Sequence, residues 1–271
     1  GPMRRIVQLL IAVVGLVVAP GVRATALPAA PAPAPAPPGI GAPADTGQRL
    51  TREQVIDRLG KATEQSPADF TGDDLSGLDL SGLDFKQATL ARATLAGTNF
   101  SHAKMFGVTL SGAMAQGADF SNAVLDVSVM RGTDLSHAKL REASLYAAIL
   151  IGADLTDADL TRARVIGALD GAKLVGATLV GTNFGADRGN QPMGLMFTNL
   201  TDADLSGANL TGANLRKASL VRANLTGANL TGADVTDANL AQAVFKSITG
   251  RDKIIGMDKA RNVDQLAPNE P

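Results

Sequence analysis

The 271-residue sequence contains no cysteine and no tryptophan, and it has a single tyrosine. Without cysteine the chain forms no disulfide and offers no thiolate to a metal ion or a substrate. The scarcity of large aromatic side chains, together with 29 glycines, favours a narrow structure built from small units. Charge of one sign is also lacking, because 25 basic residues face 26 acidic ones. This balance gives no electrostatic basis for binding nucleic acid or an anionic membrane.

Residues 1–26 combine a cloning remnant with a pattern typical of a secretory signal peptide. Residues 4–5 are both arginine, residues 6–19 are mostly apolar, and Ala24-Thr25-Ala26 supplies small residues for a signal peptidase. The alternative is a single membrane span, but the apolar run is shorter than the roughly 20 residues that a bilayer needs. We therefore expect an exported protein, periplasmic or extracellular, that keeps no stable membrane span after cleavage.

Residues 27–49 are rich in alanine and proline and predict a disordered linker. Beyond it, residues 50–65 predict a short N-terminal capping helix, because Thr51 and Gln54 form a capping-box pattern. Its expected role is to cover the open end of the structure that follows. The apolar residues predicted on its inner side are Leu50, Val55, Ile56 and Leu59.

Residues 66–250 return every five residues to the same pattern, most clearly from Asp204 to Leu240. A period of five fits neither a helix nor a strand, so the chain must turn a corner within each unit. The recurring A(D/N)LxG pattern resembles the pentapeptide-repeat family. The resemblance implies an all-β solenoid, a right-handed quadrilateral β-helix with four pentapeptides per turn. The central Leu or Phe and the Ala two residues before it would then point inward. Beyond residue 250 the period of five stops, and Val263 and Leu266 predict a short helix that closes the last coil, so residues 251–271 are expected to form a C-terminal cap and tail.

The inward centres run in frame from Phe70 to Val165 and predict stacks of residues 20 apart, such as Phe100 with Phe120. One residue is missing around 168–171, and one extra residue lies in a loop at 185–192. With these two changes, Val165 to Leu200 counts as seven units, and the whole repeat makes about nine coils. The interior should be filled, so function must lie on the outer surface, in the loop or at the ends.

No catalytic, metal-binding or cofactor-binding constellation stands apart from the repeat, so we expect no enzyme and no cofactor. Two departures from the polar outer surface suggest a site for a protein partner. The first is an apolar strip near the corner of two faces: Phe106, Val124, Val129, Tyr146, Ile149, Ile151 and Ile166. Its alternatives are cover by another part of the chain, or drift of the repeat. The second is the loop, with Asp187, Arg188, Asn190 and Gln191, which could equally be a silent insertion.

Two functions remain open. The first is a noncatalytic exported scaffold that binds a protein partner through its outer surface. The second follows from the resemblance to the pentapeptide-repeat family. The best-understood members of that family mimic DNA and act on a type II topoisomerase, by gyrase protection or inhibition. Such mimicry needs a strongly acidic surface, whereas residues 66–250 hold 18 acidic and 14 basic residues. The family often dimerises end to end, but the C-terminal segment has only enough apolar residues for a cap, so a monomer is favoured.

Overall fold

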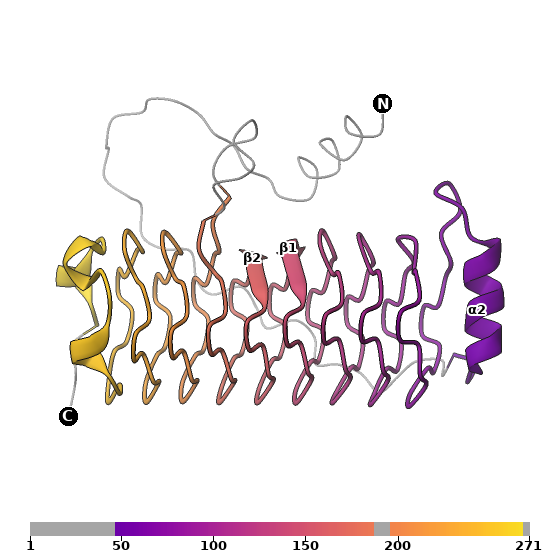
Figure 1. Cartoon of the computed structure of the whole chain (residues 1–271), viewed down its shortest axis with the longest axis horizontal. Coiled ribbons are helices and arrows are strands. Elements are labelled where there is room, and N and C mark those ends of the chain that lie inside the picture. Colours follow the sequence, from indigo (N-terminus) through magenta and orange to yellow (C-terminus); the bar gives the residue numbers. More distant parts are fainter. Residues whose placement is uncertain (1–46, 187–195, 268–271) are drawn as a thin grey trace, which may run out of the picture. The chain divides into compact units, whose positions relative to one another are not determined.

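The computed structural model describes residues 47–186 and 196–267 of the chain, which all lie in the compact unit from Ala44 to Pro271. In this unit the chain winds into stacked coils, and Figure 1 shows them side by side along the axis. Parallel bridges join each coil to the next at four positions, which makes a four-sided β-helix. We number its faces 1 to 4 after their first inward residues, which are Phe70, Leu75, Leu80 and Phe85.

Each pentapeptide forms one side of a coil because its centre bonds to the next coil and a tight corner follows. The backbone N–H of Leu90 donates to the carbonyl of Thr109 in the next coil at 2.7 Å. The N–H of Ala93 then donates back to the carbonyl of Leu90 at 3.1 Å and closes the corner. The corner residue between them, Arg92, has a left-handed backbone with φ 55°. Glycine adopts this conformation without strain, which explains its frequency two residues after a centre.

Outward polar side chains support the corners. The hydroxyl and the backbone N–H of Ser76 donate to Asp74, and these bonds hold the pKa of that carboxyl below its usual value. The same contact joins Asn209 to the N–H of Thr211 at 3.2 Å. A backbone donor at the turn is satisfied in each case.

The interior is a packed column of inward centres. Phe100 and Phe120 stack with ring centroids 5.0 Å apart and planes 9° from parallel, which confirms the predicted stack. Leu145 lies between Leu125 and Val165 in another column, and all three are fully buried. Along the described coils the interior is therefore a hydrophobic core rather than a channel for a ligand.

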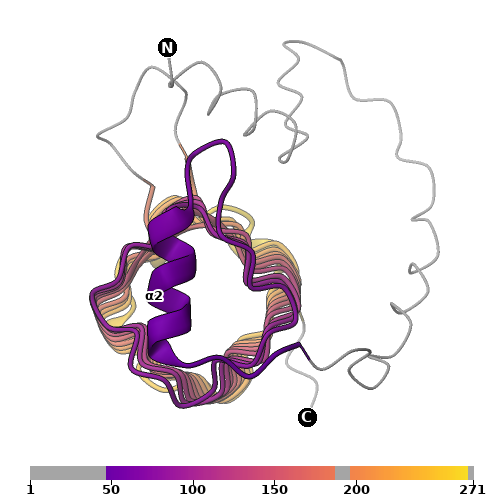
Figure 2. The same ribbon diagram turned by 90° about the vertical axis from the view of Figure 1, so that its right-hand side faces the viewer.

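Helix α2 (Arg52–Lys61) lies across the first coil, as Figure 2 shows in the view along the axis. The predicted capping box is present: the Thr51 hydroxyl accepts from the N–H of Gln54 at 3.3 Å, and the Gln54 side chain accepts from the N–H of Thr51 at 2.7 Å. The helix therefore begins where the sequence predicted.

Three of the four apolar residues predicted on the inner side of this helix are buried, namely Leu50, Val55 and Leu59. Ile56 is instead 39% exposed, contrary to the prediction. Successive helical residues project about 100° apart, so Ile56 cannot share the side that Val55 buries.

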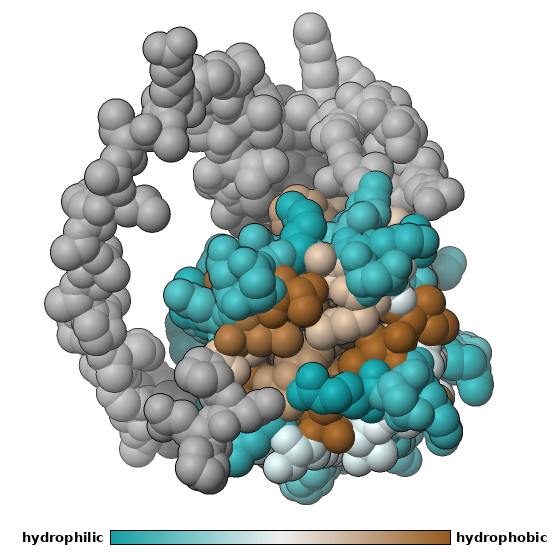
Figure 3. Space-filling model, turned by 90° about the vertical axis from the view of Figure 1, so that its left-hand side faces the viewer, coloured by the Kyte–Doolittle hydropathy of each residue, from teal (hydrophilic) through white to brown (hydrophobic). Residues whose placement is uncertain are grey.

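At the C-terminal end the period of five stops at Thr249-Gly250, and three short 3-10 turns follow: η2 (Arg251–Lys253), η3 (Met257–Lys259) and η4 (Val263–Gln265). The sequence predicted one short closing helix near Val263 and Leu266. The turns instead belong to one more coil, in which Ile255 and Arg261 pair with Asp234 and Asn239. Figure 3 shows apolar side chains among polar ones at this end.

One irregularity interrupts the stacking near the middle of the column. Strands β1 (Ser144–Ile149) and β2 (Arg164–Ala168) pair in parallel, and a register shift at Ala147 divides the pairing. Leu169 is the next fully buried centre after Val165, so this unit has four residues. The missing residue thus lies earlier than the sequence predicted.

The loop is the second irregularity. Among the described residues, Leu200 is the next inward centre after Phe184, and Ala168 pairs with Asn199, so this coil contains 31 residues instead of 20. Val165 to Leu200 therefore contains five units, and the predicted seven was wrong. The miscount arose because the missing residue and the loop together left a multiple of five. Leu200 lies on face 1, whereas seven units would have placed it on face 3.

Candidate functional site: an apolar corner on the outer surface

Apolar side chains gather on the outer surface where face 4 meets face 1. Phe106 and Val124 lie on face 4 of adjacent coils and are 41% and 39% exposed. Val129 and Ile151 lie on face 1 and are half-buried. Residues beside an inward centre point outward, and the repeat mostly places serine, threonine, aspartate or asparagine there. Contiguous apolar side chains at such positions are typical of a contact surface for another molecule.

Tyr146 lies in strand β1 of the same surface and is half-buried. The Arg164 guanidinium stands over its ring, 4.4 Å from the centroid. Asp126, in the preceding coil, accepts from the backbone N–H of Tyr146 at 2.9 Å and from the Ser144 hydroxyl at 2.5 Å. These contacts fix the tyrosine in place, so it extends the apolar surface as an ordered side chain.

The structure contradicts the prediction that Ile149 and Ile166 add to the exposed surface, since they are 7% and 1% exposed. Both belong to the strand pair where one residue is missing. The shortened unit lacks the usual corner after Val165, so Ile166 stays in strand β2 beside Tyr146 instead of projecting from a turn. Ile149 pairs with the half-buried Ala168 at the end of the same strand pair and is itself buried there.

Val127 belongs to this surface, and the sequence analysis missed it. It stands at the corner between Val124 and Val129, with a left-handed backbone of φ 59°. It is the one β-branched residue with positive φ in the described part of the chain. A β-branched side chain in this conformation is strained, by about 1–3 kcal/mol. The signal was available in the sequence, because glycine or a polar residue usually occupies this position. The apolar corner is defined by Phe106, Val124, Val127, Val129, Tyr146 and Ile151.

Ser128, which follows Val127, is a second residue that locally destabilises the fold. Among the described residues its hydroxyl is the one buried side-chain polar atom without a hydrogen-bond partner. Where threonine occupies an equivalent inward position it has one, as Thr133 shows by donating to the carbonyl of Leu110 at 2.8 Å. A buried hydroxyl without a partner destabilises a fold by about 1–3 kcal/mol. The apolar corner thus combines exposed apolar groups with two neighbouring residues that do not favour stability.

Replacing Val127 by asparagine is expected to stabilise the fold. Asparagine tolerates the left-handed backbone, and Asn122 already occupies the preceding corner with φ 58°. Relief of the strain should add about 1 kcal/mol, which raises the melting temperature by about 2–4 °C. Circular dichroism melting measures this change.

The matched control is Gly132→Val, because Gly132 has φ 59° and open space around its Cα. This reverse change should lower the melting temperature. If Val127→Asn also lowered it, packing of the valine side chain would outweigh its backbone strain.

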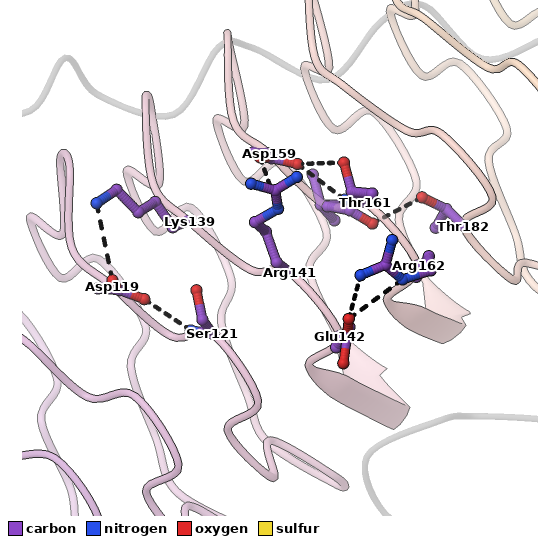
Figure 4. Close-up of polar contacts among 10 residues, drawn as sticks. Asp119, Ser121, Lys139, Arg141, Glu142, Asp159, Thr161, Arg162 and Thr182 are labelled. Atoms are coloured by element: carbon purple, nitrogen blue, oxygen red, sulfur yellow. Dashed lines mark hydrogen bonds and ion pairs between the residues drawn. The ribbon is translucent and has the colours of Figure 1, made fainter.

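The charged residues of face 3 and the corner that follows it form a regular ladder between coils (Figure 4). The ion pairs join Lys139 to Asp119 at 3.8 Å, Arg141 to Asp159 at 3.3 Å, and Arg162 to Glu142. Exposed pairs of this kind contribute little to stability. Their importance here is that they neutralise the cations of this side of the column.

The four candidate residues of the loop, Asp187, Arg188, Asn190 and Gln191, lie outside the described residues. Their predicted role in binding stays a prediction. The loop begins beyond Ala186, and Phe197 on its returning side is 50% exposed.

Side chains that could together bind a metal ion are dispersed over the described part of the structure. Within residues 47–186 and 196–267, no three histidine, aspartate or glutamate side chains are placed to hold a metal ion together. His102 and His137 lie at corners of different faces, and His137 Nδ1 is 4.0 Å from Asp157 Oδ2. No helix in the described ranges has both the length and the apolar character to cross a membrane.

Comparison with known protein families identifies the family of this chain. The model of the pentapeptide repeats matches it in eight copies, over residues 68–105, 103–141, 138–168, 198–237 and 223–247. The chain therefore belongs to the pentapeptide repeat family. No curated protein sequence matches it closely enough to count as a relative.

Solved structures of the same family resemble the chain. HetL of Nostoc sp. strain PCC 7120, a pentapeptide repeat protein involved in heterocyst differentiation regulation, is 25% identical over 82% of this chain and 99% of its own, with a TM-score of 0.35. QnrB1, a plasmid-mediated fluoroquinolone resistance protein, is 16% identical over 73% and 97%, with a TM-score of 0.44. Rfr23 of Cyanothece 51142 is 24% identical over 58% and 92%, with a TM-score of 0.21. These TM-scores lie below 0.5, so no role is carried over from these proteins.

Proposed function

We propose that this protein is a noncatalytic exported scaffold that binds a protein partner through its outer surface, at the apolar corner. The observation that supports the proposal is the exposure of Phe106 and Val124, 41% and 39%, on adjacent coils. The described interior is a packed core, so a ligand would have to bind outside it. Pentapeptide repeat proteins are generally noncatalytic, which agrees with binding as the function.

Backbone strain at Val127 also supports the proposal that the apolar corner is a binding site. Val127 has a strained backbone, and its half-buried apolar side chain extends the apolar corner. Local strain of this kind clusters at functional sites, where the gain in binding offsets the loss in stability.

The double substitution Phe106→Ser with Val124→Ser tests the site. Both side chains are more than a third exposed, so the melting temperature should stay nearly unchanged. Retention of partner protein from an envelope extract should fall to background, because the apolar centre of an interface carries most of its affinity. The readout is quantitative mass spectrometry of proteins retained by the wild type and by the variant.

The matched control is Ile56→Ser, which removes an apolar side chain of similar exposure, 39%, from helix α2. It should retain the same proteins as the wild type. Equal loss from the control and from the double variant would mean that general surface hydrophobicity, and not the apolar corner, holds those proteins.

We infer export from residues 1–26, which lie outside the described residues. The chain made from Met3 should mature by cleavage between Ala26 and Leu27. N-terminal sequencing of the envelope fraction measures this, and an intact Met3 in that fraction would contradict it.

A DNA mimic that acts on a type II topoisomerase is the alternative function. It has less support, because the repeat carries 18 acidic against 14 basic residues and basic side chains border the apolar corner. A gyrase supercoiling assay separates the two functions. Inhibition, or protection from a quinolone, at stoichiometric amounts of this protein would replace the scaffold proposal.

A further inference from the structure

Basic side chains accompany the apolar corner at a fixed spacing. Lys104 pairs directly with Val124 in the ladder of face 4. On face 1, the N–H of Gly132 donates to the carbonyl of Ile151 at 3.1 Å, which places Arg131 in the coil before Ile151. A cation one coil away lies at about 4.8 Å along the axis. Three pairs share this arrangement, each 20 residues apart: Lys86 with Phe106, Lys104 with Val124, and Arg131 with Ile151.

Three cations beside the apolar corner, Lys86, Lys104 and Arg131, form no ion pair within the described ranges, unlike the cations of face 3. Lys104 and Arg131 are exposed, and Arg131 acts on the carboxylate of Asp170 only from a distance, without an ion pair. The Lys86 ammonium donates to the carbonyl of Leu59 at 3.4 Å, again without a carboxylate. Oδ1 of the nearby Asp126 accepts two hydrogen bonds from strand β1, from the Ser144 hydroxyl and the backbone N–H of Tyr146.

The column therefore has two sides of opposite net charge over residues 84–170. Faces 4 and 1 carry five basic and three acidic residues: Lys86, Arg92, Lys104, Arg131 and Arg164, against Asp84, Asp126 and Asp170. Faces 2 and 3 carry three basic and six acidic residues: Lys139, Arg141 and Arg162, against Asp119, Asp134, Glu142, Asp154, Asp157 and Asp159. The near-neutral total charge of the chain conceals this difference.

We propose that the partner of the apolar corner is a protein segment that carries acidic side chains between apolar ones. This inference rests on the proposed function, because it names the chemistry of the partner for the same surface. The apolar side chains of the segment cover Phe106, Val124 and Ile151, and its carboxylates reach Lys104 and Arg131 at the rim. The apolar centre supplies most of the affinity. The rim charges accelerate association with acidic segments and oppose basic ones.

Two other occupants fit the charge pattern less well. A second copy in a symmetric contact would place this basic side against the basic side of its partner, and like charges across an interface oppose binding. Residues 27–46 of the chain itself contain one acidic residue, Asp45, and so offer little charge complementarity. An anionic membrane surface also attracts cations, but it is a separate class of partner and an outcome of the test.

The test uses the whole protein as bait for a phage library of random peptides of about 12 residues. Peptides that also bind Phe106→Ser with Val124→Ser are discarded, which leaves those that depend on the apolar corner. The expected survivors are enriched in aspartate and glutamate together with leucine and aromatic residues. Synthetic copies should bind Lys104→Glu with Arg131→Glu at least about tenfold more weakly than the wild type. Lys246→Glu, an exposed charge on face 2, is the matched control and should bind them normally.

Each outcome separates the inference from the proposed function. Corner-dependent peptides without acidic enrichment would overturn the inference and leave the scaffold proposal standing. Absence of any corner-dependent peptide would overturn both. Corner-dependent binding to phosphatidylglycerol vesicles, with no peptide selected, would replace the protein partner by a membrane surface. Melting of the charge-reversed variant should match the wild type, because both substituted side chains are exposed.

Discussion

Replacing Leu145 by aspartate is expected to unfold the middle of the β-helix. Leu145 is fully buried between Leu125 and Val165 in one interior column. Aspartate would remove the apolar contacts and bury a carboxylate that has no polar partner among these neighbours. The loss should be about 4–5 kcal/mol, at the upper end for a single substitution. The melting temperature should therefore fall by about 10 °C or more.

The control for this variant is Leu145→Met, which keeps the volume and apolar character of the side chain. It should lose less than about 1.5 kcal/mol. Hydrogen exchange should show faster opening of the coils next to residue 145 in the aspartate variant and little change in the methionine variant. Unchanged melting of the aspartate variant would mean that residue 145 does not face the interior.

Replacing Gly167 by alanine should also destabilise the fold strongly, for a different reason. A Cβ atom at this position would stand 2.1 Å from the backbone oxygen of Ala148, which is far inside van der Waals contact. The crowding occurs where β1 and β2 change register, so backbone and not a flexible side chain would have to move. Overpacking of this kind should destabilise the fold by about 3 kcal/mol, and thermal unfolding measures it.

Gly60→Ala provides the control, since a Cβ atom at Gly60 meets nothing within 4 Å and the residue lies in helix α2. Alanine favours helix over glycine by about 0.5–1 kcal/mol, so this variant should melt at the same temperature or slightly higher. If Gly167→Ala melted at the same temperature as Gly60→Ala, strands β1 and β2 would be able to move far enough apart to admit the Cβ atom and still keep their pairing.

The regular part of the fold could be predicted from the sequence because one five-residue pattern determines both where the backbone turns and which side chains face the interior. A centre every five residues determines which side chains face inward, and Phe100 stacks on Phe120 as expected. The capping box at Thr51 likewise depends on residues close in sequence, and it is present. Local rules therefore suffice where each unit repeats its neighbour.

The irregular part could not be predicted in the same way, because it depends on contacts between coils. Burial of Ile166 follows from the strand pairing that replaces a corner, and the sequence period does not encode that pairing. The spacing from Val165 to Leu200 is compatible with several numbers of units, and the face of Leu200 is fixed only by the pairing of Ala168 with Asn199. At the C-terminal end, the change from units of five to units of six residues gave no apolar signal strong enough to identify.

Four units per coil restrict how the gene for this protein can change in length. The apolar corner joins side chains from successive coils, from Phe106 to Ile151. Duplication or loss of a single pentapeptide between them would turn every later unit by one face and disperse the surface around the column. Gain or loss of a whole coil would keep each residue on its face. After Leu200 the copy number is free to vary, because no residue of the apolar corner lies there.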